Sequence, residues 1–136
     1  MSIRFGMVVL YVRDLARSAT FYRALGLDVP DPNPDRPVIS CRLAEGVTLL
    51  LTTDETARRL DPSRERSAAA AGDDEYQQVT EFFVDDDATV DALWAGAPAA
   101  GGVQRRVPGH LLQPYATMID DPDGNVLLIT SEPRSA

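Results

Sequence analysis

Two side chains in this sequence are the candidates for a general acid or base. Glu81 lies in the strand-like run 79–84, and His110 is the only histidine of the chain. A carboxylate or an imidazole within hydrogen-bond reach of a substrate can move a proton. Glu81 can equally hold a ligand cation or pair with an arginine such as Arg42 or Arg105, and a lone loop histidine is ordinarily solvated. The sequence leaves these alternatives open.

Several other kinds of chemistry are disfavoured by composition. All thirteen basic residues are arginine, so no lysine is present to form a Schiff base. The single cysteine, Cys41, lies between Ser40 and Arg42 on a predicted strand with no neighbouring base, which favours a small core residue over a nucleophile. The net charge of -8 repels phosphate backbones and attracts cations, so we expect no nucleic acid partner.

The length and hydropathy pattern predict a single soluble domain. A chain of 136 residues can bury a core without disulfides or metals. No apolar run approaches the roughly 20 residues that cross a bilayer, and the start of the sequence lacks the pattern of a signal peptide. We therefore expect a cytoplasmic protein without a membrane partner.

The elements that must position Glu81 and His110 fall into two similar halves. A strand over 7–12 leads to Asp14, which is a predicted N-cap for a helix reaching Leu25. A shift of 72 residues places a second strand over 79–84, a cap at Asp86 or Asp87, and a helix ending near Gly96. Alternation and turn residues predict the remaining strands over 38–43, 47–52, 103–107, a run from residue 115, and 126–130.

These elements predict an α+β fold of two βαβββ modules. Module 1 covers about residues 1–54 and module 2 about 76–132, within one domain of 1–136. Two complete modules of this kind have eight strands between them, which would form curved mixed sheets around a concave cavity, with the helices on the outer face. The segment of about 55–75 is a predicted linker and is either an inert loop or a lid. One short helix through Leu60, capped by Asp54 or Thr56, is possible where it begins.

Period-2 alternation predicts which side chains line the cavity. The lining is apolar with a few polar points, as is usual for small-molecule sites, although these faces can also simply meet a partner sheet. Trp94 and Tyr115 are further aromatic candidates; Trp94 is also a natural helix-core residue, and the inward face of 115–119 stays open. The predicted ligand-binding residues are Met7, Val9, Tyr11, Leu50, Thr52, Val79, Phe83, Trp94, Tyr115 and Leu128, with Glu81 and His110 as catalytic candidates.

Three motifs together resemble the vicinal oxygen chelate superfamily, which includes glyoxalase I, extradiol dioxygenases, and fosfomycin- and bleomycin-resistance proteins. They are residues 10–27 with Asp14, Ser18 and Phe21-Tyr22; Phe83-Val84-Asp85-Asp86; and the turn Asp121-Pro122-Asp123-Gly124-Asn125. The resemblance spans nearly the whole chain and implies the two-module fold. It says little about chemistry, because this scaffold carries many functions.

The resemblance also implies where metal ligands would stand. The two His and two Glu positions of the metal-dependent members fall on four apolar residues here, namely Met7, Leu50, Val79 and Leu128. Such side chains do not bind a hard or borderline divalent ion. We therefore expect neither a metal nor another cofactor.

The expected function is that of a metal-free binding protein of the bleomycin-resistance type. It would sequester a cationic or aromatic small molecule, an antibiotic or natural product, in clefts of a homodimer. The alternative is a metal-independent biosynthetic enzyme that catalyses a cyclisation, elimination or isomerisation through Glu81 or His110.

Overall fold

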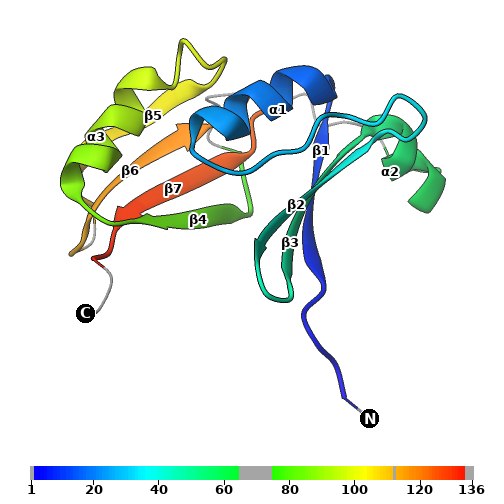
Figure 1. Cartoon of the computed structure of the whole chain (residues 1–136), viewed down its shortest axis with the longest axis horizontal. Helices are drawn as coiled ribbons and strands as arrows, with labels where there is room; N and C mark the ends of the chain where they lie inside the picture. Colours follow the sequence, from blue (N-terminus) through cyan, green and yellow to red (C-terminus); the bar gives the residue numbers. More distant parts are fainter. Residues whose placement is uncertain (1, 65–74, 112, 134–136) are drawn as a thin grey trace. The chain divides into compact units, whose positions relative to one another are not determined.

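The computed structural model describes residues 2–64, 75–111 and 113–133. Within these ranges the chain has three helices and seven strands, arranged in two separate mixed sheets, neither of which closes into a barrel. The chain divides into two compact units, Met1–Ala68 and Ala69–Ala136, and each contains one sheet (Figure 1). Among the described residues, no helix is long and apolar enough to cross a membrane.

The first unit carries a three-stranded sheet in the order β1-β3-β2. The strands are β1 (Met7–Val12), β2 (Val38–Ala44) and β3 (Val47–Thr53); β1 runs parallel and β2 antiparallel to β3. Gly46, at the β2–β3 turn, has φ +72, a left-handed conformation that glycine adopts without a steric cost. The helices α1 (Leu15–Ala24) and α2 (Asp54–Leu60) both pack against β3.

The first helix forms where its capping residues predict. The Asp14 carboxylate accepts a hydrogen bond from the Arg17 backbone N–H at 3.1 Å, which satisfies one of the free amides of the first turn. Phe21 and Tyr22 are fully buried, and their rings meet edge to face with centroids 5.1 Å apart. The stripe of helical period in the sequence therefore belongs to the core.

Alternation along the first sheet separates a buried face from a more accessible one. Leu10, Leu49, Leu51 and Ile39 lie on the buried face. We call the opposite side the Met7 face, which carries Met7, Val9 and Tyr11 from β1 and Thr48, Leu50 and Thr52 from β3.

The second unit carries a four-stranded sheet in the order β4-β7-β6-β5. Its elements are β4 (Val79–Val84), α3 (Asp87–Gly96), β5 (Val103–His110), β6 (Tyr115–Asp120) and β7 (Val126–Ser131). β4 is parallel and β6 antiparallel to the central strand β7. The helix α3 lies along one face of this sheet (Figure 1).

The turn between β6 and β7 is closed by Asp121, which is buried. One carboxylate oxygen of Asp121 accepts from the backbone N–H groups of Asp123 and Asn125, both at 2.9 Å, and the other accepts from the Asn125 side chain. Gly124 has φ +87, as a turn position of this kind requires. The turn pairs Asp120 with Val126 and so sets which residues of β6 and β7 share a face.

The predicted internal repeat is confirmed in its first half. The strands β1 and β4, and the helices α1 and α3, have bounds related by the shift of 72 residues, and Asp86 caps α3 as Asp14 caps α1. The second unit is the predicted βαβββ module. Over residues 2–64 the first unit has three strands, one fewer than a βαβββ module, so the prediction of eight strands is wrong for the described residues. Where β5 stands in the second unit, the first has a loop over 27–37 with four prolines, which cannot donate to a sheet ladder.

The predicted linker is helical where it begins, because α2 covers Asp54–Leu60. Its N-cap residue is Thr53, whose side chain makes no capping hydrogen bond. The predicted caps Asp54 and Thr56 are therefore wrong, since both lie within the helix. Residues 65–74, to which the lid alternative refers, lie outside the described part of the chain.

Candidate functional site

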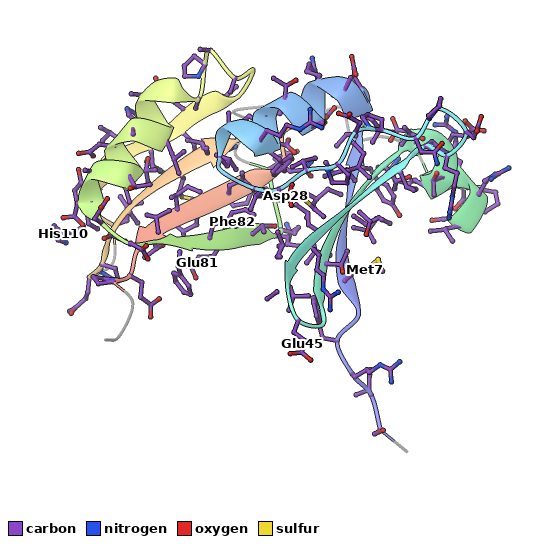
Figure 2. The ribbon with its side chains drawn as sticks, viewed as in Figure 1. Met7, Asp28, Glu45, Glu81, Phe82 and His110 are labelled. Atoms are coloured by element: carbon purple, nitrogen blue, oxygen red, sulfur yellow. The ribbon has the colours of Figure 1, made fainter. Side chains whose placement is uncertain are left out.

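The Met7 face of the first sheet presents an apolar strip on an edge strand. Met7 is 48% and Val9 39% exposed, while Tyr11 and Leu50 are half-buried. Val9 pairs directly with Leu50 across the β1–β3 ladder, so these predicted ligand-binding residues do lie together. Figure 2 shows Met7 at the beginning of β1.

Thr52, predicted as a ligand-binding residue on the same face, is fully buried. Its hydroxyl donates to the backbone oxygen of Pro37 at 2.8 Å, which ties β3 to the proline-rich loop. Thr52 therefore has a structural role, and the expectation that it contacts ligand is not supported by its position.

The second sheet presents a face built around Glu81, which we call the Glu81 face. Val79 is 37% and Phe83 61% exposed, on either side of Glu81 along the edge strand β4. Glu81 pairs with Leu128 on the central strand, and Leu128 pairs with Met118 on β6. The face therefore consists of Val79, Glu81 and Phe83 from β4, Val126, Leu128 and Thr130 from β7, and Ala116, Met118 and Asp120 from β6.

The Glu81 carboxylate is oriented by a neighbouring hydroxyl group. Thr130, which is buried, donates from Oγ1 to Glu81 Oε2 at 2.8 Å. The hydrogen bond crosses from β7 to β4 and fixes the direction of an otherwise exposed side chain. Figure 2 shows Glu81 on β4. Since only Oε2 takes part in this bond, the carboxylate keeps capacity to accept from a ligand cation or a substrate proton.

A buried ion pair lies at the β5 side of the Glu81 face. Arg105 donates from Nε and Nη2 to the two oxygens of Asp120 at 2.6 and 2.9 Å, and both side chains are almost fully buried. The Tyr76 ring lies 4.7 Å from the Arg105 guanidinium carbon. Arg105, one of the two arginines that could have paired with Glu81, thus has Asp120 as its carboxylate partner.

Tyr115 and Trp94 do not belong to the Glu81 face. Tyr115 lies three residues from Met118 on β6, so it points to the opposite side, where its hydroxyl donates to Asp91 of α3 at 2.5 Å. This hydrogen bond, followed by desolvation and the charge of Asp91, raises the pKa of Tyr115. Trp94 is half-buried on α3, one helical turn beyond the buried Val90. Both residues lie on the helix side of the sheet. This agrees with the helix-core alternative for Trp94 and gives Tyr115 the orientation that the sequence left open.

His110 also lies apart from Glu81. It is the last residue of β5, not a loop residue, and it pairs with Tyr115, on the helix side. Its ring meets the Tyr115 ring edge on, with centroids 5.6 Å apart, and Nδ1 lies 2.7 Å from the backbone oxygen of Gln113. A carbonyl oxygen only accepts, so Nδ1 carries a proton. The structure does not bring the two predicted catalytic residues together (Figure 2).

Cys41 is a buried core residue, as expected. Its thiol donates to the backbone oxygen of Asp28 at 3.3 Å. Burial, and secondarily the charge of Asp28, raises the pKa of the thiol, which makes the reactive thiolate rare.

Sequence reasoning missed two residues of these faces. Met118 pairs with Leu128, and Arg64 lies over the Tyr11 ring with its guanidinium carbon 4.6 Å from the ring centroid. The position of Met118 could have been predicted from the turn, because a turn that pairs Asp120 with Val126 also pairs Met118 with Leu128. No pattern in the sequence pointed to Arg64.

The donor set does not fit a divalent metal ion. The four positions that correspond to metal ligands carry a thioether and three aliphatic side chains, on the Met7 face and the Glu81 face. Glu81 adds a single carboxylate. Over residues 2–64, 75–111 and 113–133, no group of three or more His, Cys, Asp or Glu side chains is arranged to hold a metal. No step of a mechanism is therefore assigned to a metal.

Comparison with known proteins identifies the fold. Residues 4–129 match the model of the Glyoxalase/Bleomycin resistance protein/Dioxygenase superfamily. A hypothetical protein from S. aureus is 22% identical with a TM-score of 0.79, over 97% of this chain and 95% of that chain. A glyoxalase-related enzyme from Fulvimarina pelagi is 21% identical with a TM-score of 0.79, over 98% and 93%. A glyoxalase/bleomycin resistance protein from Albidiferax ferrireducens is 25% identical with a TM-score of 0.68, over 95% and 98%. No curated protein gives a match to this sequence.

Proposed function

We propose, from the premise that this chain belongs to the Glyoxalase/Bleomycin resistance protein/Dioxygenase superfamily, that it is a metal-independent protein that sequesters a cationic antibiotic or natural product. The observation that carries the proposal is the Glu81 face. There an exposed carboxylate is oriented by a buried hydroxyl group and is flanked by the accessible apolar residues Val79 and Phe83.

The chemistry of this face suits an organic cation with an apolar body. A charge-assisted hydrogen bond to Glu81 would hold an ammonium or amidinium group. Phe83 lies two residues away on the same side of β4, so its ring can contact the same cation or an aromatic part of the ligand. The net charge of -8 attracts such ligands before they make contact.

The proposal also includes a homodimer. Accessible apolar side chains on the Glu81 face are the kind of surface that a second chain covers. A ligand cleft between subunits would then be lined by the Glu81 face, with Val79, Phe83 and Leu128 as its apolar residues.

The test is isothermal titration calorimetry with bleomycin, a cationic antibiotic, followed by mass spectrometry of the recovered compound. We expect saturable binding to the wild type and an unchanged mass. Glu81→Gln should bind roughly 10- to 150-fold more weakly, the equivalent of the 1.5–3 kcal/mol of a hydrogen bond to a charged group. Glu45→Gln, an exposed carboxylate at the β2–β3 turn, is the matched control and should bind as the wild type does. No saturable binding, or equal affinity of Glu81→Gln, contradicts the proposal.

A second candidate is an enzyme in which Glu81 is a general base. It is favoured by the Thr130 hydrogen bond, because a base must be held in one direction to meet a substrate proton. In this case the ligand would change in mass or connectivity during incubation with the wild type. Glu81→Gln would lower turnover by about 10²–10⁴-fold while binding stayed nearly intact.

A further inference from the structure

We propose that Arg64 and Tyr11 form a binding point for an aromatic carboxylate on the Met7 face. The site lies within the first unit and does not rest on the function proposed for Glu81. It combines a fixed guanidinium, a phenol hydroxyl and an accessible apolar strip.

Arg64 lies after the end of α2, outside regular secondary structure, and yet it is held in position by hydrogen bonds. Its backbone N–H donates to the Asp61 carbonyl at 3.0 Å, and the Asp61 carboxylate accepts from the backbone and the hydroxyl of Ser63 at 3.2 and 2.7 Å. The Arg64 guanidinium donates from Nη1 to Asp54 at 3.0 Å and lies over the Tyr11 ring. The side chain is only 23% exposed, so the entropy lost on binding a ligand is smaller than for a mobile surface arginine.

The contact with Asp54 leaves one edge of the guanidinium available. In the described ranges, the structure gives no hydrogen bond from Nε or Nη2 of Arg64. These two groups form parallel donors that match the two oxygens of a carboxylate. Arg105 demonstrates the geometry in the same chain, because it holds Asp120 with its Nε and Nη2.

Tyr11 supplies the second polar group of the site. It is half-buried, and within the described part of the chain no hydrogen bond to its hydroxyl is present. The hydroxyl can therefore donate to the same carboxylate or to a neighbouring oxygen of the ligand. Since the ring already lies against Arg64, both donors belong to one place on the face.

The apolar strip explains why the ligand that carries the carboxylate should also have an aromatic ring. Val9 and Met7 precede Tyr11 along β1 on the same side, and both are accessible. An aromatic ring laid along this edge strand would cover them, while its carboxylate meets Arg64. Burial of apolar area against this strip favours binding, and an inorganic anion or a short fatty acid would not gain this contribution to the same extent.

The test is a titration with 2-naphthoate, followed by backbone amide chemical shifts of the ¹⁵N-labelled full chain. We expect saturable shifts at Val9, Tyr11 and Arg64, and weaker or absent shifts with the uncharged 2-naphthalenemethanol. Arg64→Gln should weaken naphthoate binding by at least about tenfold, since it removes a charge-assisted bidentate contact. Arg64→Lys should not restore it, because an ammonium lacks the paired donors.

Two control variants distinguish this site from nonspecific anion binding and from the Glu81 face. Arg59→Gln removes an equal charge from the exposed side of α2 and should leave the affinity unchanged, as should Glu81→Gln. The spectra of the variants also show whether each remains folded. The proposal is overturned if naphthoate gives no saturable shifts at these amides, or if Arg64→Gln binds it as the wild type does. Loss of bleomycin binding alone would instead overturn the function proposed for Glu81.

Discussion

The buried pair Arg105–Asp120 provides the sharpest test of how the second unit is held together. Arg105 is 5% and Asp120 0% exposed, and two hydrogen bonds of 2.6 and 2.9 Å join them. Removing one partner of a buried pair takes from the other charge the compensation that this partner gave, which typically costs about 3–5 kcal/mol. We therefore expect Arg105→Met to lose about 3–5 kcal/mol, a large fraction of the roughly 5–15 kcal/mol of an ordinary domain.

The same reasoning predicts recovery when both charges are removed. Replacing a whole buried pair by apolar residues is often neutral or stabilising, so Arg105→Met/Asp120→Leu should regain most of the lost stability. Arg106→Met is the matched control. It removes the same charge from an exposed neighbour on β5 and should change stability by no more than about 0.5 kcal/mol.

Urea unfolding followed by tryptophan fluorescence measures these changes. Trp94 is the only tryptophan of the chain and lies on α3, in the same unit as the ion pair, so its emission reports the unit in question. A loss below about 1 kcal/mol for Arg105→Met would be typical of an exposed pair and would refute the reasoning. A double variant as unstable as Arg105→Met would refute it as well.

Four further outcomes are expected. The Thr89 side chain, and then its backbone N–H, hold the pKa of Asp86 below its usual value, so the cap contributes fully above pH of about 4 and is lost as pH falls through the lowered pKa. The difference in Tm between wild type and Asp86→Ala should accordingly stay constant near neutral pH and shrink in acid. Cys41 should react with a thiol reagent only after unfolding, and rapid labelling of the folded protein would contradict its burial. EDTA should leave Tm unchanged, because the donor set of the described residues fits no divalent ion; a drop of several degrees would show otherwise. Light scattering should give twice the 14.8 kDa of one chain, and a monomer would exclude a cleft between subunits.

Local signals were sufficient to predict most elements of the two units. Asp14 and Asp86 cap their helices as expected, because a short carboxylate beside free amides needs no tertiary context. Alternation likewise identified the sides of β1 and β4 on which Met7 and Glu81 lie. Signals of this kind arise from residues close in sequence, and so they can be recognised without knowing the tertiary contacts of the element.

Residues whose positions were predicted wrongly are placed by strand pairing, which the alternation of apolar and polar residues does not encode. The expectation that His110 lies in a loop was wrong because β5 continues through Pro108 and Gly109, which an edge strand tolerates but a central strand does not. Register shifts on both sides of Arg106 then decide the face on which each later residue of β5 lies. A single extra residue in a ladder reverses every side chain beyond it, so the placement of His110 required the pairing itself.

For Tyr115 and Met118, the face of β6 on which each residue lies could have been predicted from the turn between β6 and β7. Both are large residues on a strand that alternation alone cannot orient, and the one predicted as a ligand-binding residue, Tyr115, lies on the helix side. The five residues between Asp120 and Val126 fix the register of the hairpin, and that register sets Met118 opposite Leu128. Once Leu128 is assigned to the Glu81 face, Met118 must share that face and Tyr115 must leave it. The orientation of β6 therefore follows from the turn together with one assigned neighbour, and not from the composition of the strand.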